Sequence, residues 1–312
     1  MSHTKPKHLP AKRGEAMRTA VAKLGMALAL LAAAAASCSP AGPTDTVQAA
    51  RFDGGRALGL VEEQLTMGPR VPGTAAHDEV IAWIVASLEE SGWEAETQGF
   101  TAQGQAGTNV LGALGEDGSP PILLGAHYDS RPVADRDEAS PESPVPGAND
   151  GASGVAVLLE LARVLPETGL NRPLWLAFFD LEDGGGAAGG DWIQGSRAFA
   201  AGLPSMPAAA IIVDMIGDAD LQIHYEMNSD PILRESIWAT ATSLGFESFI
   251  AMPRHSMLDD HIPFLELGIP SVLIIDFNYP YYHTTQDTLD KVSAESLEQV
   301  GQTLEAWLLS RP

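Results

Sequence analysis

Two segments, PILLGAHYDS at residues 121–130 and GANDGASG at residues 147–154, decide how this sequence is expected to fold. The first contains a short apolar run, residues 122–126, that is typical of a buried strand, and it ends in His127. The second places Asp150 among small residues at the start of an apolar helical pattern. A metal site at a strand end can be formed in this way, because the strand ends in a histidine and the helix begins beside a carboxylate.

The composition indicates a globular, strongly acidic protein. The chain has 312 residues, which allows one large α/β domain with a sizeable core. It has 18 Lys and Arg against 41 Asp and Glu, a net charge of −23. Such a surface repels nucleic acid and anionic lipid headgroups, so we expect neither as a partner. The acidity itself indicates solubility or salt adaptation rather than a particular function.

The N-terminus resembles an export signal. Lys23 precedes an uninterrupted apolar run over residues 24–36, which is too short to span a bilayer comfortably but suits a signal peptide. Cys38 is the single cysteine, which excludes an internal disulfide. The residues AASC at 35–38 resemble the bacterial lipobox, in which the cysteine is lipidated; an ordinary Ala-rich cleavage site is the alternative. Either Met1 or Met17 is the start.

We therefore expect export from a bacterial cytoplasm to the periplasm or cell envelope, with a lipid anchor at Cys38 as the one contact with the membrane. The expected organisation is a signal segment at 1–38, a flexible tether at 39–50 and one catalytic domain at 51–312.

Helical and strand-like apolar patterns alternate along that domain. Helices are expected over residues 55–66, 75–91, 152–165, 231–244, 260–267 and 293–310. Strands are expected over 94–101, 108–114, 122–126, 174–179, 208–213, 221–225 and 271–275, the first two as an edge hairpin. Asp191 is expected to cap a helix over 192–200, and the run GGGAAGG at 184–190 to be a mobile loop without regular structure. This alternation predicts a single-domain α/β fold, an open, mostly parallel twisted sheet with helices on both faces.

Five candidate metal ligands stand at or just past the carboxyl ends of apolar strands, the edge where open α/β sheets bind ligands. Two histidines with carboxylates suit zinc best among common metals. Each residue also has a simpler explanation: a helix cap for Asp150, a surface loop for His283, a turn for Asp214. Chance explains one such residue at this edge of the sheet much more easily than it explains all five. They are His127, Asp150, Asp183, Asp214 and His283.

Glu182 directly precedes Asp183, and adjacent residues at a strand end can point in different directions. One can bind metal while the other moves protons, because a carboxylate beside a metal centre is a common general base. A solvated loop acid is the alternative explanation for Glu182.

With these segments in view, the chain resembles the zinc exopeptidase superfamily. Its two relevant branches are double-zinc aminopeptidases and single-zinc glutaminyl-peptide cyclotransferases. The first and last of the matching segments resemble the cyclotransferase branch more closely. The segments are GPRVPG at 68–73, GAHYDS at 125–130, GANDGASG at 147–154, FFDLED at 178–183, and DDHIPF at 259–264 with GIP at 268–270.

The resemblance implies a role for each matching residue. A catalytic zinc would be held by Asp150, Asp183 and His283. Glu182 would be the acid/base, with Asp214 and Asp259 in its hydrogen-bonded network. His127, with Asp214, would bind the second metal of the peptidases.

The sequence departs from the animal cyclases around the substrate. Tyr282 stands where they have tryptophan, and Leu273 or a neighbour stands where they have histidine. The Gly-rich loop lacks their aromatic residue. Tyr282 and Phe277 are expected to enclose the substrate.

The implied activity is conversion of an N-terminal glutamine to pyroglutamate with release of ammonia, using one Zn²⁺. The alternative is an aminopeptidase with two zinc ions. A surface protein that binds without chemistry is a third reading, which Glu182 beside a full ligand set argues against. The expected partners are peptides or proteins with a free N-terminal residue, glutamine favoured.

Overall fold

A six-stranded sheet is the centre of the part of the chain that the computed structural model describes, residues 51–170 and 172–310. The strands lie in the order β1-β2-β4-β3-β5-β8. Four of them run parallel: β3 (Ile122–His127), β4 (Leu174–Phe179), β5 (Ala209–Asp214) and β8 (Ser271–Ile275). β1 (Glu94–Ala102) and β2 (Gln105–Leu114) form an antiparallel hairpin at one edge. The expected mostly parallel sheet is confirmed.

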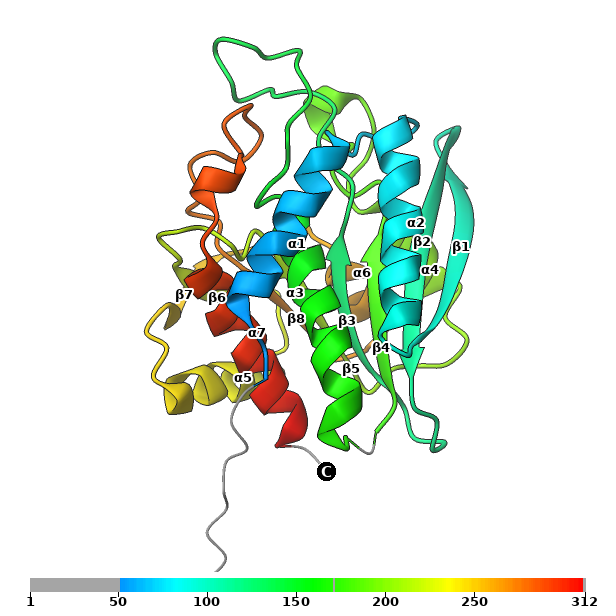
Figure 1. Ribbon diagram of the computed structural model, residues 1–312, viewed down its shortest axis with the longest axis vertical. Coiled ribbons are helices and arrows are strands. Elements are labelled where there is room, and N and C mark those ends of the chain that lie inside the picture. Colours follow the sequence, from blue (N-terminus) through cyan, green and yellow to red (C-terminus); the bar gives the residue numbers. More distant parts are fainter. Residues whose placement is uncertain (1–50, 171, 311–312) are drawn as a thin grey trace, which may run out of the picture. The chain divides into compact units, whose positions relative to one another are not determined.

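Both faces of this sheet are covered. Alternate residues of β3 and β5 pack to opposite sides: Leu124 and Ile211 enter the larger core, Leu123 and Ile212 the smaller one. The larger core contains α1 (Gly54–Met67), α2 (Ala75–Glu90), α3 (Ala152–Val164), α5 (Pro231–Leu244) and α7 (Ala294–Leu309). Figure 1 shows α1, α2 and α3 in front of the sheet. The smaller core contains α4 (Gln194–Ala201) and α6 (Ile262–Glu266). Burial on both faces explains the nearly continuous apolar runs of the central strands.

A separate two-stranded parallel sheet joins β6 (Ile223–Glu226) to β7 (Phe249–His255). The sequence patterns did not predict β7. Within it Phe249 is buried, whereas the rest is largely exposed and includes Pro253, so the strand lacks the alternation by which a strand is recognised.

Two local predictions around the Gly-rich run were wrong. α4 begins at Gln194, and its N-cap is Ile193, in the left-handed region at φ 56°, without a side-chain cap. Asp191 instead accepts a hydrogen bond from the Gln103 amide. The run at 184–190 contains a 3-10 turn, Gly186–Ala188, and a bridge between Gly185 and Gly190. The glycines thus permit a compact turn here rather than an irregular loop.

The predictions for the signal segment, Cys38 and the tether concern residues outside the described part. Within residues 51–170 and 172–310, no helix has the length and apolar character needed to cross a bilayer.

Candidate zinc site

A cavity of about 300 Å³ lies at the carboxyl ends of the parallel strands. It combines ionisable groups at its base with apolar and aromatic walls, as ligand sites commonly do. Its lining residues are Asp150, Glu182, Trp192, Asp214, Met215, Met257, Leu258, Asp259, Ile275, Phe277, Tyr282 and His283. Every sequence-predicted site residue except His127 and Asp183 lines this cavity, and those two lie directly behind its wall in contact with Asp214 and His283.

The five predicted ligands form two clusters that share Asp150. In the first, Nε2 of His283 is 3.3 Å from Oδ1 of Asp183 and 3.9 Å from Oδ2 of Asp150. In the second, Nε2 of His127 is 3.1 Å from Oδ1 of Asp214 and 3.3 Å from Oδ1 of Asp150. Within each cluster the ligand atoms all lie within 4.8 Å of one another.

The first cluster fits a zinc ion. It offers one imidazole nitrogen and two carboxylates, a three-ligand set that leaves a fourth position open. Oδ2 of Asp183 is buried and has no hydrogen-bond partner within the described part of the chain. Burial, together with the charge of Asp150, raises the pKa of Asp183 to about 6. A bound cation would supply the positive charge that these crowded carboxylates need.

Asp150 does not cap α3. The loop that precedes this helix holds it in place. The N-cap of α3 is Gly151, at φ 91°, and no side chain caps this helix. A Cβ at Gly151 would lie 2.8 Å from the carbonyl oxygen of Asp129. The backbone N–H of Asp150 donates to Asp287, and the buried Arg70 guanidinium donates to the Gly147 carbonyl at 2.6 Å. Arg70, in the segment GPRVPG, thus fixes the loop that places Asp150 in the site.

Asp129 orients the two acids after β4. Its carboxylate accepts the backbone N–H of Glu182 and that of Asp183, each at 3.1 Å. Leu181 just before them adopts φ 54°. Fixing the backbone here lets the side chains diverge, so that Glu182 lines the cavity while Asp183 meets His283. The role of Asp129 was missed, although it lies within the quoted segment GAHYDS.

Glu182 is a buried acid, not a solvated loop residue. Its side chain lines the cavity, and the residue is 9% exposed. Burial raises its pKa well above the usual value, and the charges of Asp183, Asp260 and Asp259 add to the rise. Burial and the charge of Asp214 also raise the pKa of Asp259, to about 7. Buried acids with raised pKa values suit proton transfer near neutrality.

Asp214 lies beside His127, the residue with which the resemblance implies that it binds a second metal. Its carboxylate accepts from His127 at 3.1 Å. The charge of Asp214 raises the pKa of Asp259, and the charge of Asp259 in turn raises the pKa of Glu182. The hydrogen-bonded network implied for Asp214 and Asp259 around Glu182 stays a prediction.

Aromatic side chains form the walls. Phe277 and Tyr282 lie 5.1 Å apart, ring centre to ring centre. Trp192 stacks on His283 at 5.9 Å with an interplanar angle of 10°. A Cβ at Gly185 would lie 2.2 Å from this indole, so the glycine makes room for it. The sequence analysis did not predict Trp192 as a wall residue, and it supplies an aromatic side chain beside the Gly-rich run. Leu273, which stands at or beside the position where the animal cyclases have histidine, is buried in the smaller core.

Arg131 connects several of these parts and was also missed. Its buried guanidinium donates to Oδ1 of Asp183 at 2.9 Å and to the Gly185 carbonyl at 3.1 Å. It also lies 4.9 Å from the centre of the Trp192 ring. One cation therefore holds a candidate ligand, the Gly-rich turn and an aromatic wall.

Glu226 braces the loop that carries Met257 and Asp259 into the cavity. Its buried carboxylate accepts the backbone N–H of Met257 at 2.9 Å and that of Ser229 at 2.7 Å. Nε2 of His261 lies 3.3 Å from the same carboxylate. The end of β6 thus fixes one side of the cavity.

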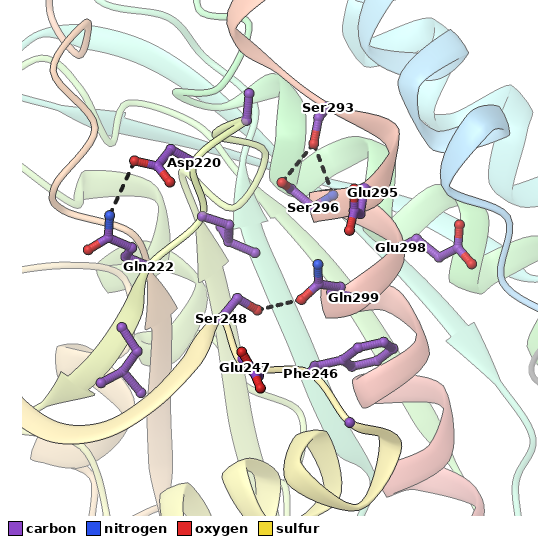
Figure 2. A pocket seen from close by; sticks show the side chains of 14 residues that line it. Asp220, Gln222, Phe246, Glu247, Ser248, Ser293, Glu295, Ser296, Glu298 and Gln299 are labelled. Atoms are coloured by element: carbon purple, nitrogen blue, oxygen red, sulfur yellow. Dashed lines mark hydrogen bonds between the residues drawn. The ribbon is translucent and has the colours of Figure 1, made fainter.

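A larger hollow of about 730 Å³ lies elsewhere, between the start of α7, residues 219–222 before β6 and the connection from α5 to β7 (Figure 2). Asp220, Glu247 and Glu295 in it are exposed, and Ser248 donates to Gln299 at 2.7 Å. None of its lining residues is a histidine, and the groups seen in Figure 2 are arranged as an open polar groove. The chemistry therefore belongs to the smaller cavity.

Comparison with known proteins agrees with this fold. The model of peptidase family M28 matches residues 109–308. Aminopeptidase YwaD of Bacillus subtilis is 29% identical over 200 residues, which cover 59% of this chain and 40% of that protein. The structure is similar to a Zn-dependent exopeptidase from Parabacteroides distasonis (TM-score 0.79, 29% identity, 83% of this chain and 99% of that chain). It is also similar to the glutaminyl cyclase of Porphyromonas gingivalis (TM-score 0.80, 31% identity, 85% and 100%).

The chain belongs to peptidase family M28. It is a zinc-dependent enzyme of that family, which includes relatives named as aminopeptidases and as glutaminyl cyclases.

Proposed function

We propose that this enzyme is a glutaminyl-peptide cyclotransferase, which converts an N-terminal glutamine to pyroglutamate. The observation that carries the proposal is a pair of buried acids, Glu182 and Asp259, inside a small cavity walled by Trp192, Phe277 and Tyr282. Cyclisation needs proton transfer within an enclosed space and no water as a reactant. The P. gingivalis glutaminyl cyclase, matched over its whole length, supports this reading.

The chain's own residues can perform the proton transfers. The substrate's α-amine attacks the side-chain amide carbon, a ring C–N bond forms, and the bond to the amide nitrogen breaks. Glu182 takes a proton from the amine and delivers one to the departing ammonia. Asp150, Asp183 and His283 would hold zinc, which would supply a Lewis acid for the amide carbonyl. Aromatic walls orient the glutamine side chain and exclude water.

The second candidate is a two-zinc aminopeptidase. The cluster of His127, Asp150 and Asp214 favours it, because these ligand atoms are close enough to hold a second ion.

Metal counting and product analysis separate the two enzymes. The purified protein is incubated with Gln-peptides and Leu-peptides while ammonia and free amino acids are measured. A cyclase contains one zinc and releases ammonia from Gln-peptides, and His127→Ala leaves its zinc content unchanged. His224→Ala, which changes a half-buried histidine of β6 outside both ligand clusters, is the control. Two zinc ions in the native protein, one in His127→Ala, and leucine released from Leu-peptides would establish the aminopeptidase instead.

A further inference from the structure

Arg136 lies against the outer side of the cavity wall. Its backbone N–H donates to the carbonyl of His283 at 3.2 Å, which places its loop over the site. Its guanidinium carbon is 3.8 Å from the centre of the Tyr282 ring. Tyr282 and His283 both line the cavity, and Tyr282 is half-buried. The Arg136 side chain is exposed, so its charge stands where the wall meets solvent.

The Arg136 guanidinium is not engaged in an ion pair among the residues that the structure describes. None of the ion pairs in residues 51–170 and 172–310 includes Arg136. The acids on either side of it are occupied, since Asp135 pairs with Arg131 and Asp137 accepts from Thr285. Stacking on an aromatic ring uses the face of a guanidinium and leaves its N–H edge free to bind a carboxylate.

The cavity's size determines which part of a peptide reaches this edge. About 300 Å³ is at the low end for ligand cavities and suits one N-terminal residue. The next residues of the peptide therefore lie outside the cavity. The net charge of −23 disfavours a carboxylate on those residues. Arg136, stacked on the wall residue Tyr282, is an exposed cation beside the cavity that can offset this repulsion.

We propose that Arg136 is a specificity residue that binds a carboxylate on the second or third residue of the peptide substrate. The enzyme then prefers peptides with Asp or Glu close behind the N-terminal residue. The inference rests on the proposed action at peptide N-termini. It does not depend on whether the N-terminal residue is cyclised or removed, because Arg136 contacts the part of the peptide that follows.

The test compares peptides that differ by one charge and almost nothing in shape. The substrates are Gln-Glu-Ala-amide against Gln-Gln-Ala-amide, and Gln-Ala-Glu-amide against Gln-Ala-Gln-amide. The ratio of kcat/KM for the acidic peptide to that for its neutral twin is measured in native protein and in Arg136→Gln. We expect a ratio about two- to fivefold higher in the native protein in at least one pair, the range for an exposed ion pair. Added salt should shrink this difference.

Two further variants isolate the charge from the packing. Arg136→Lys keeps the charge without the planar fork and should retain part of the preference. Arg197→Gln removes a charge from an exposed pair with Glu266 and should leave the ratio at the native value. Equal ratios in native protein and Arg136→Gln would overturn the proposal. In that case Arg136 supports Tyr282 structurally, and turnover of both peptides falls together.

A parallel Leu-Glu-Ala-amide and Leu-Gln-Ala-amide pair keeps the two proposals apart. Turnover of the Leu-peptides alone, with the ratio still dependent on Arg136, would reject cyclisation and keep the specificity residue. Ammonia release from Gln-peptides, with the same ratio in native protein and in Arg136→Gln, would keep cyclisation and reject the specificity residue.

Discussion

Glu226 is expected to contribute more to stability than any ordinary surface acid, although it lies outside the ligand set. Its carboxylate accepts backbone N–H groups from Asn228, Ser229 and Met257 and lies beside His261. In Glu226→Gln an NH₂ group replaces one of the two oxygens and faces donors on either side. At least one buried N–H then loses its acceptor.

Two estimates of the cost agree. An unsatisfied buried donor costs about 1–3 kcal/mol. Burial opposes ionisation of Glu226, but the nearby His261 ring and hydrogen bonds from the backbone outweigh it and lower the pKa from 4.5 to about 2. That shift corresponds to about 3 kcal/mol, which we reduce to about 2 kcal/mol for screening by solvent. We expect Glu226→Gln to lower the free energy of unfolding by about 2–3 kcal/mol at pH 7, and Tm by about 5–10 °C.

The sign of the pH dependence follows from the lowered pKa. The stabilisation by ionised Glu226 is fully present above the unfolded pKa near 4.5 and is lost as the pH falls toward 2. The difference between native protein and Glu226→Gln should therefore be constant from pH 7 to 5 and shrink below pH 4.5.

Urea unfolding of both proteins at pH 7, 5 and 3.5 measures this difference. Glu266→Gln is the matched control, because Glu266 is exposed and its loss should change stability by less than about 0.5 kcal/mol. A cost for Glu226→Gln as small as that of the control, or a difference that grows on acidification, would refute the reasoning.

Two other predictions concern acids of contrasting roles. Glu182→Gln should keep its zinc but lose about 10²–10⁴ in kcat, measured by ammonia release, because the amide cannot accept a proton; near-native turnover would move the base to Asp259. Burial raises the pKa of Asp276 to about 6 from 3.8, so this residue costs stability as the pH rises from about 4 to 6. Relative to Asp276→Asn, the native protein should lose about 2 kcal/mol over that interval in urea unfolding, after allowance for screening; a difference independent of pH would contradict the assignment.

Much of the fold could be predicted because its signals are local. The parallel strands β4 and β8 and the helix α5 have the expected bounds, since each is a compact apolar pattern between turn residues. β7 has no such pattern and was missed. α4 was misplaced because a positive φ at Ile193 starts it, and a side-chain cap does not. Backbone strain of that kind depends on the surrounding structure and leaves no sequence signal.

By itself, the sequence determined which acids and histidines would meet. Parallel strands bring their carboxyl ends to one edge, so residues that end apolar runs are gathered there wherever they lie along the chain. Asp183 lies beside His283 for this reason, and His127 lies beside Asp150.

Only the tertiary structure decided what surrounds those ligands. Arg131, Trp192 and Arg136 come from loops whose course depends on contacts with distant segments, such as the Arg136 N–H to His283 carbonyl bond. The pairing of Asp214 with His127, and the burial that raises the pKa of Glu182, likewise arise from packing. Apolar periodicity specifies which elements form, whereas loop contacts and burial exist only after those elements have packed together.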